Sequence, residues 1–436
     1  MEVIKIVREK SLLKKLTTWG LIAIGGLAIF LPFGTAQAKA KQPQYKFEAK
    51  EIYVTDAKTG QTIYQKNGNT KRPIASLSKL MTLYLTKQAI DQHHLSWNQK
   101  VPVSKPLIKM SKSYELGTFK IKKSKQYTVK QLYQAALIAS SNSAAIALGE
   151  AVANGNNTKF ISMMNAQAKQ WHINAHFVSS SGLDNTDLTK YHLQVPGTGK
   201  KAQNMVSAKA ISTVAAKVLG EFPQITKWSS QPSMKVGNQV LVNSNRLLKG
   251  DVFYKKSARV DGLKTGFTDT AGLCLTVSFW HQGRHLIATI IDSNTIFSSM
   301  AKLVQAIEKN YVSHAVTVRD HRLAVGKHTI TAVPQQAKTV VWYRKGTQTP
   351  AVAVRYQDTV NATSVAKNQQ VGSALIQLKG QNQTATVPML AASTVKAPVK
   401  HKKAAHHQSL FAKISETLVG IVTGFLKIIG NFIKHF

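Results

Sequence analysis

Two side chains that could act as a nucleophile and its base lie three residues apart in this chain. Ser76 and Lys79 lie in the segment Pro-Ile-Ala-Ser-Leu-Ser-Lys (73–79). On a helix, positions i and i+3 share a face, so the Lys79 amine can lie beside the Ser76 hydroxyl. A serine attacks when an adjacent base takes its proton, and lysine is such a base when burial or a nearby cation lowers its pKa. S-x-x-K alone is weak evidence, because a lysine-rich chain produces it by chance.

Two later segments make the pattern more specific. Ser140-Ser141-Asn142 interrupts a helical stretch, and Lys264-Thr265-Gly266 comes before a strand that we expect to begin after Asp269. In isolation, the first is better explained as a helix cap and the second as a turn at the start of a strand. However, S-x-x-K, S-x-N and K-T-G occur in this order, 64 and 124 residues apart. The ordered triple is a strong signal for serine acyl-transfer chemistry.

At these motifs the chain resembles the serine-type D-alanyl-D-alanine carboxypeptidases, the low-molecular-weight penicillin-binding proteins of the penicillin-recognising, β-lactamase-like fold. The longer segments 75–82, 243–248 and 261–268, and the pair Gly182-Leu183, also resemble the family. Two positions depart from it: Phe267 stands where many members have His, and Ser143 where many have Asp. The resemblance runs from about Phe47 through the β-rich part and includes the terminal helix.

The resemblance implies a site made of eight residues. Catalytic roles fall to Ser76, Lys79, Ser140 and Asn142, and substrate binding to Lys264, Thr265, Gly266 and Phe267. Ser76 would attack the carbonyl of the penultimate D-Ala of a peptidoglycan stem peptide ending in D-Ala-D-Ala. Lys264 and Thr265 would hold the terminal carboxylate, and the backbone N–H groups of Ser76 and Phe267 would form the oxyanion hole. β-Lactam antibiotics would be partners at the same serine, and neither a cofactor nor a metal is implied.

Three alternatives stay open beside the carboxypeptidase. A β-lactamase shares S-x-x-K and K-T-G, but no E-x-x-L-N segment supplies a glutamate for deacylation. A wall-binding protein of the same fold that has lost its chemistry is possible, although every motif residue is intact. An endopeptidase is the third. A zinc peptidase is rejected, because His172 and His176 have the right spacing but no glutamate follows His172.

Composition narrows the class of protein further. The 58 Lys and Arg residues against 19 Asp and Glu residues give a formal net charge of +39, which excludes an acidic, solvating chain. The single cysteine, Cys274, excludes an intramolecular disulfide and is expected to be an inert core thiol. Such a cationic chain fits an anionic bacterial envelope. No nucleic-acid partner is expected, because no recognition motif accompanies the charge.

The elements that must position these motifs alternate between strands and helices. We expect a hairpin from strands 52–54 and 61–65, a buried helix over 78–90, and a capped helix from Thr128 to about Ile138 followed by another from Ala144. Strands 272–280 and 285–292 and a helix through 300–307 come next. The prediction is an α+β fold: an antiparallel sheet flanked by helices, with an inserted all-helical region.

The remaining segments suggest export and attachment. Residues 1–38 are interpreted as a signal peptide, since basic residues precede a short apolar run and Ala36-Gln37-Ala38. The catalytic region is predicted over 41–312 and a small all-β domain over 313–395, from Val/Thr-rich runs every 10–15 residues. A basic linker, 396–407, then precedes an amphipathic helix, 408–436, expected to lie on an anionic membrane surface at the extracytoplasmic side.

Overall fold

The computed structural model describes residues 46–346, 350–360, 362–379, 381 and 383–397. The predicted signal peptide (1–38), all but the first two residues of the predicted basic linker (396–407) and the predicted terminal helix (408–436) lie outside the described residues. Within the described part, no helix combines the length and apolar character needed to cross a bilayer.

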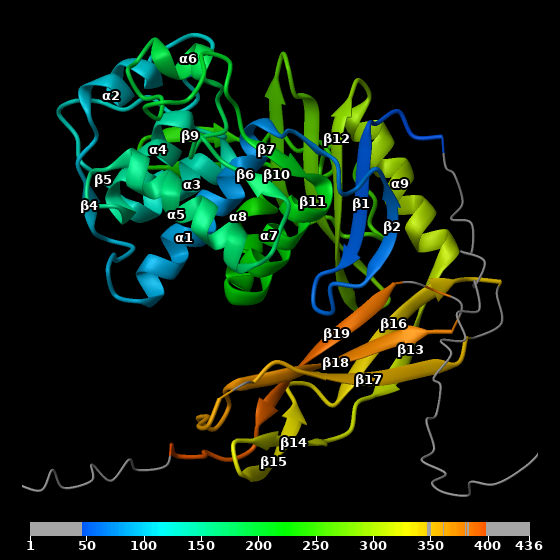
Figure 1. Cartoon of the computed structure of the whole chain (residues 1–436). Coiled ribbons are helices and arrows are strands. Elements are labelled where there is room, and N and C mark those ends of the chain that lie inside the picture. Colours follow the sequence, from blue (N-terminus) through cyan, green and yellow to red (C-terminus); the bar gives the residue numbers. More distant parts are fainter. Residues whose placement is uncertain (1–45, 347–349, 361, 380, 382, 398–436) are drawn as a thin grey trace, which may run out of the picture. The chain divides into compact units, whose positions relative to one another are not determined.

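A five-stranded antiparallel sheet forms the centre of the N-terminal three quarters of the described chain (Figure 1). Its strand order is β10-β11-β12-β1-β2, so the first two strands in the sequence pair beside three strands that come some 200 residues later. The strands are β1 (Glu51–Asp56), β2 (Thr62–Lys66), β10 (Gly262–Thr268), β11 (Gly272–His281) and β12 (Arg284–Ser293). The β1–β2 turn has Gly60 at φ +66°, the left-handed conformation expected of a glycine there.

Residues between β2 and β10 form the predicted helical insertion. Its helices are the 3₁₀ turn η1 (Ala75–Ser78), α1 (Lys79–Asp91), α2 (Lys105–Ser111), α3 (Val129–Ile138), α4 (Asn142–Val152), α5 (Asn157–Gln170), α6 (Asn185–Thr189), α7 (Ala208–Glu221), the 3₁₀ turn η2 (Pro223–Ile225) and α8 (Thr226–Ser229). Short strands join them: β3 (Lys71–Pro73), β4 (Lys100–Val101), β5 (Tyr127–Thr128), β6 (Ala175–His176), β7 (Met205–Ser207), β8 (Ser233–Val236) and β9 (Gln239–Val242). The predicted capping box is present, with Thr128 and Gln131 bonding each other's backbone at the start of α3.

The two faces of the sheet are covered by different helices, as Figure 1 shows. Alternate residues of a strand point to opposite faces. Accordingly, Ile287 and Ile291 of β12 join the core of the helical insertion, while Leu286, Ala288 and Ile290 join the core beneath α9 (Ile296–Asn310). The α+β class with its inserted helical region is thereby confirmed.

Within the described residues from Tyr311 onward, every regular element is a strand. These are β13 (Tyr311–Thr317), β14 (His321–Val325), β15 (His328–Pro334), β16 (Lys338–Arg344), β17 (Val352–Asp358), β18 (Gln370–Leu378) and β19 (Thr384–Ala391). They form a β13-β16 pair and a sheet of order β14-β15-β19-β18-β17 around a separate apolar core. The Val/Thr-rich runs in the sequence, at 315–318, 329–333, 340–343, 352–356 and 374–378, coincide with β13, β15, β16, β17 and β18. The other two strands were not among these runs: β14 has a single Val and no Thr, and β19 contains Pro388.

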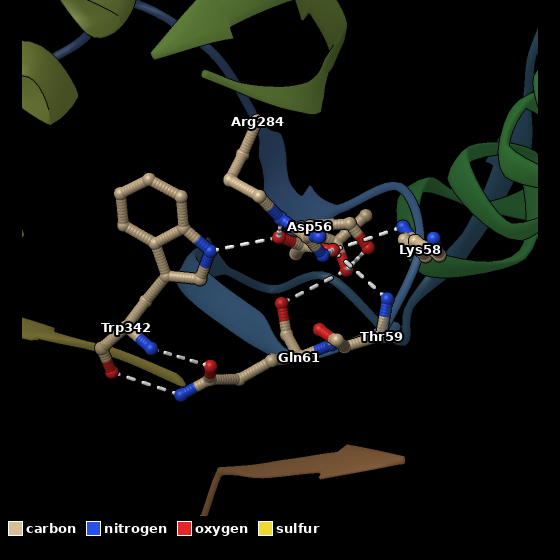
Figure 2. A network of polar contacts seen from close by, with 7 residues as sticks. Asp56, Lys58, Thr59, Gln61, Arg284 and Trp342 are labelled. Atoms are coloured by element: carbon tan, nitrogen blue, oxygen red, sulfur yellow. Dashed lines mark hydrogen bonds and ion pairs between the residues drawn. The ribbon is translucent and has the colours of Figure 1, made fainter. Parts of the chain in front are cut away.

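A buried polar network connects the β1–β2 turn with β12 and β16 (Figure 2). The Asp56 carboxylate accepts hydrogen bonds from Arg284 at 2.8 and 3.0 Å, from Trp342 Nε1 at 2.9 Å and from the backbone N–H of Lys58 and Thr59. Gln61 pairs with both backbone groups of Trp342, at 2.7 and 2.9 Å. Burial alone would raise the pKa of Asp56, but these donors outweigh it and lower the pKa, so the carboxylate stays ionised.

Candidate active site

Ser76 and Lys79 are joined at the transition from a 3₁₀ turn to a helix. Ser76 lies within η1, and Lys79 is the first residue of α1. A 3₁₀ turn has three residues per turn, so side chains three apart eclipse each other. The Lys79 Nζ therefore donates to the Ser76 Oγ at 2.8 Å. The expected helix over 78–90 is present, but the nucleophile itself belongs to the tighter turn before it.

The Lys79 amine is fully buried and surrounded by acceptors. Besides Ser76, its Nζ bonds the Asn142 Oδ1 at 2.8 Å and the Ser181 carbonyl at 2.7 Å. Three acceptors match the three N–H groups of an ammonium. Burial, and secondly the charge of Lys264, hold the pKa of Lys79 well below its usual value. This is the environment in which lysine can be a neutral base at ordinary pH.

The three residues of the S-x-N segment have different roles: Ser141 caps the helix that follows, and Ser140 and Asn142 belong to the site. Ser141 is the N-cap of α4 and accepts from the Ala144 backbone N–H at 3.2 Å. The helix therefore begins at Asn142, two residues before the predicted Ala144, because the cap lies earlier than expected. Asn142 donates from Nδ2 to the Leu116 carbonyl at 3.2 Å, which fixes its Oδ1 toward Lys79. Ser140 has φ +56° and lines the same cavity as Ser76.

The K-T-G segment lies inside strand β10, and the strand expected after Asp269 is β11, which begins at Gly272. Its turn-like residues pair in register with β11, from Gly262 opposite Ser278 to Thr268 opposite Gly272. β10 is the edge strand of the sheet and contacts η1. A side chain on Gly266 would place its Cβ 3.0 Å from the Ile74 carbonyl and 3.2 Å from the Ser76 nitrogen. Glycine is thus what lets β10 approach the nucleophile.

Lys264 is a residue of the edge strand β10, and its side chain is buried. Its exposed fraction is 2%, and its Nζ donates to the Thr265 carbonyl at 2.9 Å. Burial lowers the pKa of Lys264 to about 7. Because Lys79 and Lys264 are neighbours, the protonation state of each depends on that of the other.

A cavity of about 250 Å³ opens over these groups. Six of the eight predicted residues line it: Ser76, Ser140, Asn142, Thr265, Gly266 and Phe267. Lys79 and Lys264 are not among its lining residues and lie buried. Phe267 is 59% exposed, so its ring faces solvent at the cavity edge.

The cavity also contains residues to which the sequence analysis assigned no role. The Ser244 hydroxyl lies 2.6 Å from the Thr265 Oγ1, and Ser244 belongs to a segment that resembled the family, which was the available signal. Glu115 and Leu116 come from a loop with no periodic pattern, so nothing in the sequence pointed to them. Ser181 contributes a carbonyl, which any residue could supply. Its neighbour Gly182 is constrained, because a Cβ there would lie 2.0 Å from the Ala75 carbonyl.

Cys274 also lines the cavity, although it is only 2% exposed. Burial raises the pKa of its thiol to about 12, so it stays protonated at neutral pH. Within the described residues, no three His, Cys, Asp or Glu side chains are grouped closely enough to hold a metal ion.

Comparison with known proteins gives a consistent result. The family model for D-alanyl-D-alanine carboxypeptidases, peptidase S11, matches residues 36–295. The D-alanyl-D-alanine carboxypeptidase DacF of Bacillus subtilis (strain 168) is 27% identical over 408 residues, which are 90% of this chain and 96% of that protein. DacD of Escherichia coli (strain K12) is 30% identical over 244 residues, 55% of this chain and 57% of that protein.

Solved structures show the same relationship. A peptidoglycan synthesis regulatory factor (PBP3) from Streptococcus pneumoniae superposes with a TM-score of 0.64 at 25% identity, covering 80% of this chain and all of that chain. Penicillin-binding protein D2 from Listeria monocytogenes, in its ampicillin-bound form, has a TM-score of 0.50 at 29% identity, covering 60% of this chain and 98% of that chain. Because the family match spans more than half of the sequence and includes all three motifs, this chain belongs to the S11 peptidase family, the serine-type D-alanyl-D-alanine carboxypeptidases.

Proposed function

We propose that this carboxypeptidase removes the terminal D-Ala from peptidoglycan stem peptides through an acyl-enzyme on Ser76. The observation that carries the proposal is the 2.8 Å contact between a solvent-accessible Ser76 hydroxyl and a buried Lys79 amine of lowered pKa. A neutral amine at this distance can take the hydroxyl proton as the oxygen attacks.

The first half of the reaction forms an ester. The Ser76 Oγ attacks the carbonyl carbon of the penultimate D-Ala, and its proton passes to the Lys79 Nζ. The backbone N–H groups of Ser76 and Phe267 receive the developing negative charge, a contribution of about 3–4 kcal/mol per donor in known oxyanion holes. The C–N bond then breaks, and the departing D-Ala amine takes a proton relayed from Lys79 through the Ser140 hydroxyl. The acyl group stays on Ser76.

The second half uses water in place of the amine. Lys79, neutral again, takes a proton from a water molecule that attacks the ester carbonyl, and the Ser76 Oγ leaves with a proton. Asn142 holds the substrate amide. Before acylation, Thr265, Ser244 and the Lys264 charge hold the terminal carboxylate of the substrate on the β10 side of the cavity.

Covalent labelling tests the assignment of the nucleophile. Incubation with a penicillin, followed by digestion and mass spectrometry, should place the adduct on Ser76, and release of D-Ala from an N-acetylated pentapeptide should be saturable. The Ser76→Ala variant should lose both activities while keeping its thermal unfolding midpoint. An adduct on another residue would refute the mechanism. Labelling without any D-Ala release would favour a catalytically impaired relative, and rapid penicillin turnover would favour a β-lactamase.

A second proposal concerns attachment. We propose that the mature enzyme works at the extracytoplasmic face of the cell membrane, held there by residues 408–436. The support is the sequence: apolar residues cover a broad face and lysines a narrow stripe, and a basic run precedes them. Deleting 409–436 should release the protein from membranes without changing kcat on a soluble peptide. Pelleting that survives the deletion and a high-salt wash would contradict it.

A further inference from the structure

A second cavity, separate from the catalytic one, is lined by lysines. It has a volume of about 480 Å³, and its lining includes Lys105, Lys109, Lys112, Lys123 and Tyr191. Residues 105–125 contain seven lysines and one acidic residue, Glu115. Glu115 lines the catalytic cavity and not this one. The proposed reaction does not use any of the four lysines.

The four ammonium groups have no internal counter-charge. All four residues are exposed, and none forms an ion pair within the described part of the chain. Lys105 and Lys109 lie in α2 and Lys112 is its C-cap residue, and their spacings of four and three place them on one face of the helix. Like charges at such spacings destabilise a helix, so this arrangement favours a bound anion that relieves the repulsion.

The backbone that carries these lysines is fixed before any ligand arrives. The loop after α2 is tied to the helix because the Ile121 backbone N–H donates to the Ser111 Oγ at 3.0 Å. The Gln239 side chain bonds both backbone groups of Lys120, each at 2.9 Å. Lys123 is therefore held opposite α2, and only side-chain freedom is lost on binding.

We propose that this lysine pocket binds successive phosphodiester groups of a linear anionic polymer of the cell wall. Lysines are compact point charges that suit phosphate groups without demanding the planar geometry that an arginine requires. Four charges around one cavity exceed what a single phosphate can neutralise, whereas a polymer supplies one charge per repeat. A concave site accepts a chain, whereas a bilayer presents a broad surface. The location in the wall rests on the proposed function, but the binding itself does not.

The lysine pocket and the catalytic cavity are connected by one turn of the chain, from Ser113 to Gly117. Ser113 lines the lysine pocket, and its carbonyl accepts from the Gly117 N–H at 2.9 Å while its hydroxyl accepts from the Leu116 N–H at 3.3 Å. Leu116 lines the catalytic cavity and holds Asn142. A polymer in the pocket would therefore keep the catalytic cleft close to the wall from which stem peptides project.

The test compares two double variants of the full chain that lose the same charge. Lys109→Gln/Lys123→Gln removes two pocket lysines, and Lys159→Gln/Lys209→Gln removes two exposed lysines that line neither cavity. The probe is a defined poly(glycerol phosphate) chain, with binding measured by calorimetry at several salt concentrations. The pocket variant should lose about tenfold or more in affinity, and its slope of log K against log salt should fall by about two, one per lysine. The control should change by less than about twofold.

Activity and two other anions complete the test. Both variants should release D-Ala from a soluble peptide at the native rate. Vesicles of phosphatidylglycerol and phosphatidylcholine should bind both variants equally, and inorganic phosphate should compete only at high concentration. Equal loss of polymer affinity in both variants, or no polymer binding by the native chain, would overturn the proposal. A vesicle-binding defect specific to the pocket variant would overturn the assignment to a wall polymer.

Discussion

Lys79 can serve in two protonation states because its three acceptors are already in place. As an ammonium it donates to Ser76, Asn142 and Ser181, and as a neutral amine it keeps two of these bonds and offers a lone pair to the Ser76 proton. Burial and the Lys264 charge bring the two states closer in energy than they are in water. The side chain is therefore poised as a base without a large rearrangement.

Replacing Lys79 should stop acylation. Lys79→Arg keeps a positive charge that cannot accept a proton, and Lys79→Met matches the chain length without a base. We expect the second-order rate constant for penicillin acylation to fall by about 10²–10⁴-fold in both, the usual contribution of general-base catalysis. Lys87→Arg, in the same helix and paired with Asp91, is the matched control and should acylate normally. Near-native labelling of correctly folded Lys79→Met would rule out Lys79 as the base.

The pKa of Lys264, about 7, predicts how activity depends on pH. Lys264 is charged below this value, so its attraction for a substrate carboxylate is present at lower pH and lost as the pH rises through about 7. The kcat/KM for a D-Ala-D-Ala peptide should therefore fall above pH 7, because this parameter reports groups of the free enzyme. In Lys264→Gln that alkaline limb should disappear and KM should rise. A C-terminally amidated peptide should be a poor substrate, and its kcat/KM should not show this fall above pH 7. An unchanged alkaline limb in Lys264→Gln would contradict the assignment.

Among the elements, the contact between β10 and η1 sets the geometry of the cavity. The edge strand comes so close to the turn that Gly266 has no room for a side chain beside the Ile74 carbonyl and the Ser76 nitrogen. The same closeness sets the distance between the Phe267 and Ser76 backbone N–H groups, which the oxyanion hole requires. A shift of a few tenths of an ångström here affects both donors.

Gly266→Ala tests this contact. The added Cβ should push β10 away from η1 and lower the acylation rate by at least about tenfold, because oxyanion stabilisation depends on donor position. Gly220→Ala is the control, since Gly220 lies in α7 with no atom within 4 Å of an added Cβ. It should keep full activity and gain about 0.5–1 kcal/mol in stability from the better helix former. Full activity in Gly266→Ala would show that the approach is not critical.

On the scale of the whole molecule, the Asp56 network fastens β16 to the β1–β2 turn. Trp342 comes from the strands after α9, yet its ring packs in the core beneath that helix and its Nε1 bonds Asp56 (Figure 2). The Thr386 backbone N–H adds a bond from β19 to the Thr59 carbonyl at 2.9 Å. Folding of the strand-rich C-terminal part is thereby coupled to the sheet that carries the K-T-G motif.

Trp342→Phe should measure that coupling. Phenylalanine keeps much of the ring packing but removes the donor to Asp56, and a hydrogen bond to a charged group contributes about 1.5–3 kcal/mol. The urea midpoint should fall accordingly, with kcat unchanged. Tyr114→Phe is the control, because Tyr114 is 101% exposed. An unchanged midpoint would show that the Trp342–Asp56 bond does not contribute to stability.

Local sequence patterns were sufficient to predict the reaction class and most of the elements. S-x-x-K, S-x-N and K-T-G are local patterns, and so are the capping box at Thr128 and the apolar runs that form β11 and β12. The family match and the α+β fold confirm those predictions. The strand expected after Asp269 is β11, and the K-T-G segment lies in the adjacent strand β10, which pairs with β11 along its whole length.

How the motifs meet, and which residues surround them, depends on the packing of the folded chain. Glu115, Leu116, Ser181 and Ser244 reach the site from loops, where backbone groups and single polar side chains carry no periodic signal. The Asp56–Trp342 network likewise joins residues far apart in the chain, and Tyr191 joins the lysine pocket from a segment distant from the lysines in sequence. The lowered pKa values of Lys79 and Lys264 follow from burial, and burial is a property of the packed molecule that no local spacing encodes.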